Sequence, residues 1–471
     1  MPKKPWRQLT FLLGEAALAL ASGGVLFIII SRVAGPAVLG TYALALAWLT
    51  LFQGVSGFGI PDFIMREVGA YGRNAAGPVI HAMALGLGMG TMAVCTMLGA
   101  CRLLGYPTDV VQVISIASLA VVPAFLNTAC RAVFLAFREI HLSFLAALIE
   151  VAIMLPASLL LLFSGAGALA LIVTLVIAKI ASASISLAFL YGRVAPVRPA
   201  FDWRLLRRTA AAVGVFGIGT MLGMLSMRVN IIMASLWVDI AAVGHFAAAT
   251  KIMEIGLMFP SLLGQLLMSR IAYSFNTQGD RDPNRFSAWY RVLLAFILPT
   301  FVGAWVFAGV IMETLFGPGF GTAVWTFRIL MIYFLFESIE IVTSTILRAA
   351  QRAREDVGFL VFNPVTNIVL NLLLLPSLGT VGSAIGRVAG VVVSTALRNV
   401  FIARQLGAVS WFRFALKPAL ISIGVGWLCS ALPIGHPLWL LLAYAVASAA
   451  LLKLSASFSF AAIKDMMTLP S

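Results

Sequence analysis

The feature that most constrains this chain is a succession of apolar runs, each about 20 residues long, separated by short polar segments. Only 10% of the residues are charged, and the mean hydropathy is +1.03. A soluble domain carries roughly a quarter charged residues, so a chain with so few could not cover its own surface in water. Helical runs of this length match the hydrocarbon core of a bilayer. The pattern therefore predicts an all-α integral membrane protein.

The apolar runs define about fourteen predicted spans. They lie near residues 11–31, 41–60, 79–100, 112–131, 142–163, 168–190, 210–235, 244–268, 291–312, 326–347, 359–376, 381–402, 415–432 and 438–454. The first run is too long for the apolar part of a typical signal peptide, so we interpret it as an uncleaved span. Every connecting segment is short, which leaves the helical bundle itself to carry the function.

The basic residues predict the orientation of the chain. If the N-terminus is cytoplasmic, 25 of the 32 Lys and Arg residues fall at cytoplasmic ends, and we count Arg131 and Arg398 among them. Two, Arg32 and Arg102, fall at the outer ends, and five lie within spans. Such an asymmetry is the positive-inside pattern of membrane proteins. It predicts cytoplasmic N- and C-termini, and it assigns the net charge of +15 to loops beside anionic lipid headgroups rather than to nucleic-acid binding.

A weak internal repeat relates the two halves of the chain. A shift of 204 residues places Gly40 over Gly244 and Arg66 over Arg270, and a shift of 214 places Gly165 over Gly379. Six spans per half would give both halves the same orientation, with a pseudo-two-fold axis along the membrane normal. We predict a six-helix lobe at 1–208, a second at 209–409, and two additional C-terminal helices at 410–471.

Two glycine- and proline-containing segments carry a resemblance to a known family. The first runs from Ala34 to Ala45 and is followed by Gly57-Phe58-Gly59-Ile60 and Arg66-Glu67; the second runs from Leu375 to Ala384. They resemble the polysaccharide-transporter branch, the Wzx-type oligosaccharide flippases, of the multidrug/oligosaccharidyl-lipid/polysaccharide exporter superfamily.

The resemblance implies a two-lobed bundle that works by alternating access in the bacterial inner membrane. It also implies passage of a polyprenyl-diphosphate-linked oligosaccharide to the outer leaflet for surface polysaccharide assembly. A polysaccharide polymerase and glycosyltransferases are the candidate protein partners.

Other functions stay open at this point. A lipid II flippase has the same number of spans, and a multidrug cation antiporter of the same superfamily would have twelve spans and an acidic cavity. A membrane glycosyltransferase or polymerase is less favoured, because the outer loops offer only three acids: Asp109, Asp239 and Glu313. No phosphate-binding loop of an ATP-driven pump occurs. We therefore expect a transporter rather than an enzyme.

Ionisable residues inside spans are costly, which makes them functional candidates. Four basic residues, Arg228, Lys251, Arg387 and Lys179, could form a cationic surface for a diphosphate or an acidic sugar. The alternative is that they form salt bridges between helices or extend to the interface. For Arg328, two residues from a span end, the second interpretation is favoured.

Five acidic residues are candidates for proton or ion coupling: Glu254, Glu337, Glu340, Glu15 and Glu150. Glu337 and Glu340 share one face of a span, and two carboxylates there cannot both ionise cheaply. One of them is expected to hold a proton unless a buried Arg or Lys from another span pairs with it. Glu254 follows Lys251 by three residues and could simply pair with it.

Three asparagines, Asn363, Asn367 and Asn371, recur every four residues and form one polar stripe on a span. In lipid such a stripe must face protein or water, so it either lines a sugar path or joins two helices. The four cysteines show no CxxC spacing, and the sequence predicts no metal site and no cofactor.

Overall fold

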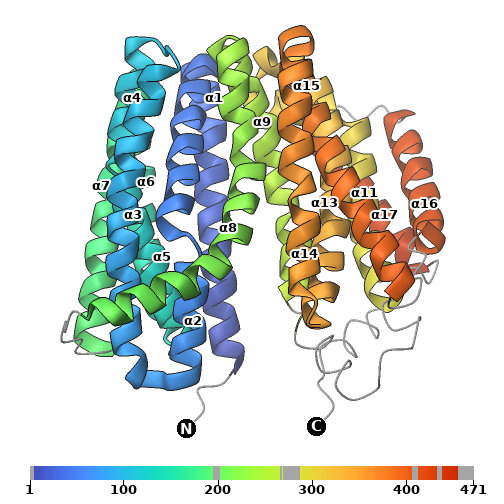
Figure 1. Ribbon diagram of the computed structural model, residues 1–471. Helices are drawn as coiled ribbons and strands as arrows, with labels where there is room; N and C mark the ends of the chain where they lie inside the picture. The colour runs from blue at the N-terminus through green and yellow to red at the C-terminus, as the bar shows by residue number, and fades with distance from the viewer. Residues whose placement is uncertain are drawn as a thin grey trace. The chain divides into compact units, whose positions relative to one another are not determined.

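The computed structural model describes residues 5–194, 202–265, 268, 287–405, 412–431 and 437–454, and every regular element in these ranges is helical. The chain divides into two compact units, residues 1–247 and 248–471. This division does not test the predicted lobe boundary at residues 208 and 209, which stays a prediction. Each unit is a bundle of long helices (Figure 1).

The helices of the first unit and the segment that leads into the second are these: α1 (Pro5–Gly57), α2 (Ile60–Tyr71), η1 (Gly72–Ala75), α3 (Ala76–Leu103), α4 (Thr108–Ser118), α5 (Val121–Ala136), α6 (Ile140–Phe163), α7 (Ala168–Phe189), η2 (Leu190–Val194), α8 (Trp203–Trp237) and α9 (Ile240–Gly256). Those of the second unit are α11 (Ser287–Val306), α12 (Ala308–Phe316), η3 (Pro318–Ala323), α13 (Val324–Ala349), α14 (Ala353–Leu360), α15 (Phe362–Gln405), α16 (Phe412–Ala431) and α17 (Pro437–Leu454).

Eleven helices of the described chain are long and apolar enough to cross a membrane, and the apolar helix Trp439–Lys453 is shorter. This confirms a multi-pass, all-α membrane protein. Two of the eleven contain a break: Gly35 in α1 has φ 81°, and Gly379 in α15 has φ 56°. Glycine tolerates these positive φ values without a steric penalty, and each break falls between two predicted spans. The number of fourteen crossings stays a prediction.

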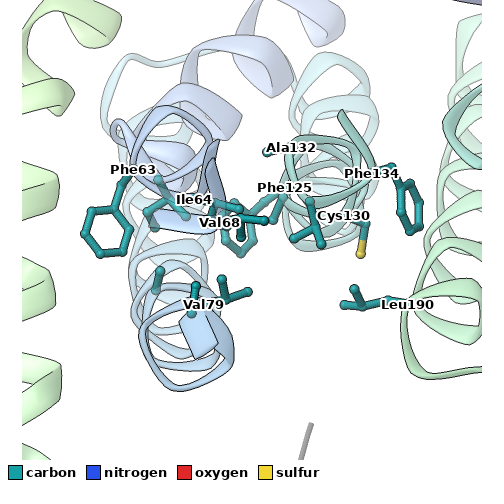
Figure 2. Close-up of a cluster of buried hydrophobic side chains, with 14 of the residues drawn as sticks. Phe63, Ile64, Val68, Val79, Phe125, Cys130, Ala132, Phe134 and Leu190 are labelled. Carbon is teal, nitrogen blue, oxygen red and sulfur yellow. The ribbon is translucent and has the colours of Figure 1, made fainter. Parts of the chain in front are cut away.

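In the first unit, α1 packs against α3, α4, α5, α6 and α8. A cluster of buried apolar side chains joins α2, α3 and α5, with Phe63, Ile64, Val79 and Phe125 among its members (Figure 2). Gly86 of α3 admits this close packing, because a Cβ there would lie 2.0 Å from the Phe125 ring. Lipid tails are as apolar as these side chains, so close packing rather than escape from water holds such helices together.

The repeat predicted from sequence has a counterpart in a close backbone contact. A Cβ on Gly40 would lie 1.9 Å from the Ile240 carbonyl oxygen, and one on Gly244 would lie 2.0 Å from the Pro36 carbonyl oxygen. The 204-residue shift relates Gly40 to Gly244 and also Pro36 to Ile240. The contact is therefore reciprocal between equivalent positions, and only glycine leaves room for it.

In the second unit, α13 packs most extensively against α15, and α16 packs against α11 and α17. The sequence offered no role for the last two helices. In the structure, Tyr444 of α17 donates a hydrogen bond to the Pro299 carbonyl of α11 at 2.9 Å. A Cβ on Gly303 would lie 2.4 Å from the Tyr444 ring. Tyr444 thus fastens α17 to α11, while α16 packs on α11 directly.

Candidate functional site

A buried charge network lies between α13 and α15 in the second unit. Its central residue is Arg398, which is completely buried. Its guanidinium donates to Glu340 Oε1 at 2.5 Å and to Asp356 Oδ1 at 2.9 Å. Because one cation holds two carboxylates from different helices, Arg398 ties α13 and α14 to α15. We call Arg398, Glu340 and Asp356, together with Arg348 and Glu337, the α13–α15 charge network.

Neutral hydroxyls complete the bonding of the network. Thr395 donates to Glu340 Oε2 at 3.1 Å, and Ser344 donates to Asp356 Oδ2 at 2.8 Å. Arg348, whose side chain is half exposed, donates to the same Asp356 oxygen at 2.8 Å. Asp356 also lies in the first turn of α14, where the helix dipole favours a negative charge. These partners offset the cost of burying ionised groups away from water.

From the sequence, Arg398 was counted among the basic residues at cytoplasmic ends, which stays a prediction; the structure adds that its side chain is buried inside the protein. The helix continues to Gln405 and packs Arg398 against α13. An arginine near a span end gives the same sequence pattern whether its side chain is exposed to water or buried in the protein. The available signal was that residue 398 lay within the predicted span 381–402, with Ser394 and Thr395 just before it.

Glu337 and Glu340, which the sequence placed on one face of a span, have different surroundings in the structure. Glu340 is paired with a buried arginine of another helix, which is the alternative foreseen from the sequence. Glu337 interacts with the Tyr333 hydroxyl, and its Oε2 has no hydrogen-bond partner. Both carboxylates line a cavity of about 360 Å³, with Ser344, Arg348 and Arg398 also in its wall.

Arg387 of α15 is also buried, with 1% of its surface exposed. Its guanidinium lies over the Tyr333 ring at 4.4 Å from the centroid, as in a cation–π contact. None of its three guanidinium nitrogens has a hydrogen-bond partner. Buried arginines are normally hydrogen-bonded, because an unmet donor loses its hydration without compensation. The site therefore retains donors for an anionic or polar partner.

The asparagine stripe packs against the second half of its own helix. Three glycines of α15, Gly382, Gly386 and Gly390, also recur every four residues. A Cβ on Gly390 would lie 2.5 Å from the Asn363 carbonyl oxygen, and one on Gly386 would lie 3.0 Å from Asn371 Nδ2. Asn363, Asn367 and Asn371 are all buried. This geometry favours the helix-joining interpretation of the stripe over a lining for a sugar path.

A second polar cluster lies in the first unit, between α1, α5, α6 and α7. Arg131 Nε donates to Glu15 Oε1 at 2.6 Å, and the Ser143 hydroxyl donates to the same oxygen at 3.1 Å. Lys179 pairs with Glu150 at 2.6 Å. We call these residues, with Asn127, the α1–α5 polar cluster.

This cluster borders an open cavity of about 100 Å³, which Glu15, Arg131 and Glu150 help to line. The amide oxygen of Asn127 accepts hydrogen bonds from Ser186 at 2.9 Å and from Ser182 at 3.4 Å. Arg131 is the last residue of the predicted span 112–131, and the structure places it inside α5, which continues to Ala136. Its partner Glu15 is 116 residues away in the chain, so no local pattern could have connected the two.

The remaining candidates occupy two different units. Arg228 lies in α8 of the first unit, and Lys251 lies in the part of α9 that belongs to the second. Lys251 Nζ is 4.0 Å from Glu254 Oε2, as the spacing of three residues allows. Arg328 donates to the Trp305 carbonyl at 3.2 Å and lies over the Trp325 ring. Within the described residues, no three His, Cys, Asp or Glu side chains are placed to hold a metal ion.

A comparison with curated proteins finds a flippase. The chain is 23% identical over 176 residues to the probable low-salt glycan biosynthesis flippase Agl15 of Haloferax volcanii. The match covers 35% of this chain and 37% of that protein, so the chain spans little more than a third of the relative's length.

Solved structures with the same fold are transporters. The chain superposes on the lipid II flippase MurJ in an inward closed conformation with a TM-score of 0.78, covering 95% of this chain and 100% of MurJ at 13% identity. An inward-facing multidrug resistance MATE family transporter of the MOP superfamily gives 0.67, at 16% identity, with 85% and 98% of the two chains covered. At such identities the likeness shows the fold alone.

The family model described as "Polysaccharide biosynthesis protein" matches residues 18–268, which is more than half of the 471 residues. Its match begins in α1 and covers both glycines of the reciprocal contact. The named relatives are flippases and transporters rather than enzymes. The family match and the fold confirm the resemblance read from the sequence, and the chain belongs to the polysaccharide biosynthesis protein family of multi-pass membrane proteins.

Proposed function

We propose that this protein is a flippase that moves a polyprenyl-diphosphate-linked oligosaccharide from the cytoplasmic to the outer leaflet of the bacterial inner membrane, for assembly of a surface polysaccharide. The observation that carries the proposal is the match of residues 18–268 to the polysaccharide biosynthesis family. The glycan flippase named among its relatives and the MurJ-like fold support the same class of substrate, a glycan on a lipid carrier.

The distribution of intramembrane charge supports an anionic substrate. The cationic candidates Arg228, Lys251 and Arg387 lie on three long helices, and a diphosphate would be attracted to guanidinium and ammonium groups. Arg387 supports this further, because its guanidinium nitrogens keep unused donors. A drug cation would be repelled by the same groups, which disfavours a multidrug antiporter.

The transport step does not require an ion gradient. A diphosphate that moves outward across an inside-negative membrane gains up to ~2.3 kcal/mol per charge per 100 mV. Proton coupling is compatible with the structure nonetheless, because Glu337 has a carboxylate oxygen without a hydrogen-bond partner beside a cavity. Glu15, Glu150, Glu254 and Glu340, each beside a basic residue, are the weaker coupling candidates.

The test is deletion of the gene followed by analysis of lipid-linked sugars in each leaflet. We expect polyprenyl-diphosphate oligosaccharide to accumulate in the cytoplasmic leaflet and surface polysaccharide to be lost. Normal glycan export, together with altered sensitivity to cationic drugs, would instead favour a multidrug antiporter. Accumulation of lipid II with normal surface polysaccharide would favour a lipid II flippase.

Complementation with single variants then tests the cationic residues. We expect Arg387→Gln, Arg228→Ala and Lys251→Ala to fail to restore surface polysaccharide while reaching wild-type levels in the membrane. Arg404→Gln is the matched control, because Arg404 is exposed at the end of the same helix as Arg387. Full restoration by Arg387→Gln would remove Arg387 from the substrate path.

A further inference from the structure

An apolar cavity of about 260 Å³ lies in the first unit, between one end of α2, α3, α5 and α7. Five members of the buried cluster also line it, among them Val68, Val79 and Leu190, which Figure 2 labels. All the residues in its wall are apolar, glycine or tyrosine. A cavity without polar partners holds water poorly but accepts hydrocarbon.

The cavity opens at the end of the unit that the charge distribution assigns to the cytoplasm. Tyr191 lines it and is 61% exposed, and Tyr71, which precedes the lining residue Gly72, is 63% exposed. Tyrosines with exposed rings gather where lipid tails meet headgroups. Their position places the mouth of the cavity at the depth of the headgroups.

The N-terminal end of α8, which is rich in arginine, is held against α3 near this mouth. The backbone N–H of Asp202 donates to His81 Nε2 at 2.9 Å, while His81 Nδ1 lies 2.8 Å from the Gly77 carbonyl oxygen. His81 is buried on α3, directly after the lining residue Ile80. A second contact joins the same helices, since a Cβ on Gly77 would lie 3.4 Å from Leu205. The first turns of α8 are therefore held against the helix that forms one wall of the cavity.

The first turns of α8 carry an unbalanced positive charge. Arg204, Arg207 and Arg208 are exposed, and so is Trp203. The Asp202 carboxylate is engaged as the helix cap, accepting from the Arg204 backbone N–H at 2.8 Å. An exposed tryptophan followed by clustered arginines is the pattern of a helix that lies on an anionic membrane surface.

We propose that this cavity and the start of α8 form a binding site for an anionic phospholipid of the cytoplasmic leaflet. One acyl chain occupies the cavity, and the headgroup phosphate lies on the arginines of α8. The volume suits part of one hydrocarbon chain, and the exposed arginines suit a headgroup phosphate; a phospholipid of the cytoplasmic leaflet supplies both, and a lipid-linked sugar in its place is an outcome of the test. The site is independent of the substrate proposed above, and its occupant would stabilise the docking of α8 on α3.

Native mass spectrometry of the full-length protein tests the site. The protein would be reconstituted in nanodiscs of phosphatidylcholine with phosphatidylglycerol, released, and scored for retained lipid.

Ala84→Trp fills the cavity, since Ala84 is part of its wall. Gly88→Trp is its control, because Gly88 lies one turn further along α3, exposed and with no atom within 4 Å of its Cβ position. Arg207→Gln/Arg208→Gln removes headgroup charge, and Arg354→Gln/Arg404→Gln removes equal charge from exposed positions of the second unit.

We expect the wild type and both controls to retain phosphatidylglycerol in preference to phosphatidylcholine. Ala84→Trp and the Arg207/Arg208 variant should each lose the retained lipid severalfold. Equal retention in all variants, or equal retention of the two phospholipids, would overturn the proposal. If Ala84→Trp fails to reach the membrane, the Arg207/Arg208 pair decides the question. Retention of a polyprenyl-linked species by protein purified from its own membrane, in place of phospholipid, would likewise overturn it.

Discussion

At the scale of single residues, Arg398 is the group on which the second unit depends most. It is completely buried and neutralises Glu340 and Asp356 at 2.5 and 2.9 Å. A buried ion pair gains little over an apolar pair of the same size, but removing one partner leaves an uncompensated charge. Because Arg398 serves two carboxylates, its loss would take the arginine from Glu340 and leave Asp356 with the half-exposed Arg348.

We expect Arg398→Gln to destabilise the protein by about 3–5 kcal/mol, the usual cost of breaking a buried ion pair from one side. Thermal unfolding of the purified protein in detergent would measure the change. Arg348→Gln is the control on the same carboxylate, and it should cost much less, because the Arg348 side chain is 55% exposed. Equal losses of stability in the two variants would contradict the central role given to Arg398.

At the scale of helices, close approach of backbones determines how the elements pack. The glycines Gly382, Gly386 and Gly390 let the two halves of α15 meet along the asparagine stripe. Small residues at such spacing are the usual device for joining helices in lipid, where apolar side chains gain nothing by leaving the solvent. The same device brings Gly40 and Gly244 into their reciprocal contact.

Gly390→Ala should separate the two halves of α15, because its Cβ would lie 2.5 Å from the Asn363 carbonyl oxygen. We expect a loss of about 1–3 kcal/mol, the range for overpacking a well-filled interior. The midpoint of thermal unfolding in detergent would report it. Gly424→Ala is matched in chemistry but meets no atom within 4 Å, and it should leave the midpoint unchanged. A neutral Gly390→Ala would mean that the halves can move apart freely.

At the scale of the whole molecule, each unit encloses its own polar cluster within an apolar bundle. The α1–α5 polar cluster and the α13–α15 charge network both pair acids and bases from helices far apart in the chain. The hydrocarbon region of a bilayer contains no water that could hydrogen-bond to these groups, so their partners must come from the protein. The basic residues that face water are instead distributed by the positive-inside pattern.

The predicted orientation can be tested with single cysteines in a chain whose four native cysteines are replaced. Leu103→Cys, at a position 89% exposed at the end of α3, should react with an impermeant maleimide added to spheroplasts. Tyr71 is 63% exposed at the end of α2, just before α3 begins. A cysteine at this position should react only after permeabilisation. The reverse labelling pattern would place the N-terminus outside.

The sequence by itself determined the class of protein, the approximate spans, the predicted orientation and the family. Whether a segment spans the bilayer, and in which direction, depends on the hydropathy and charge of that segment and its flanks. These are local properties that can be read from the sequence. The glycine- and proline-containing segments that carry the family resemblance are local in the same way. The breaks at Gly35 and Gly379 fall where the sequence placed the ends of spans.

Only the tertiary structure decided which charged side chains meet. Glu340 and Arg398 are 58 positions apart, and Glu15 and Arg131 are 116 apart. Whether two such residues pair depends on the rotation and depth of each helix after packing, and a single sequence does not encode these quantities in any local pattern. For the same reason the sequence did not reveal that Arg398 is buried and paired, or that an apolar cavity lies beside α8.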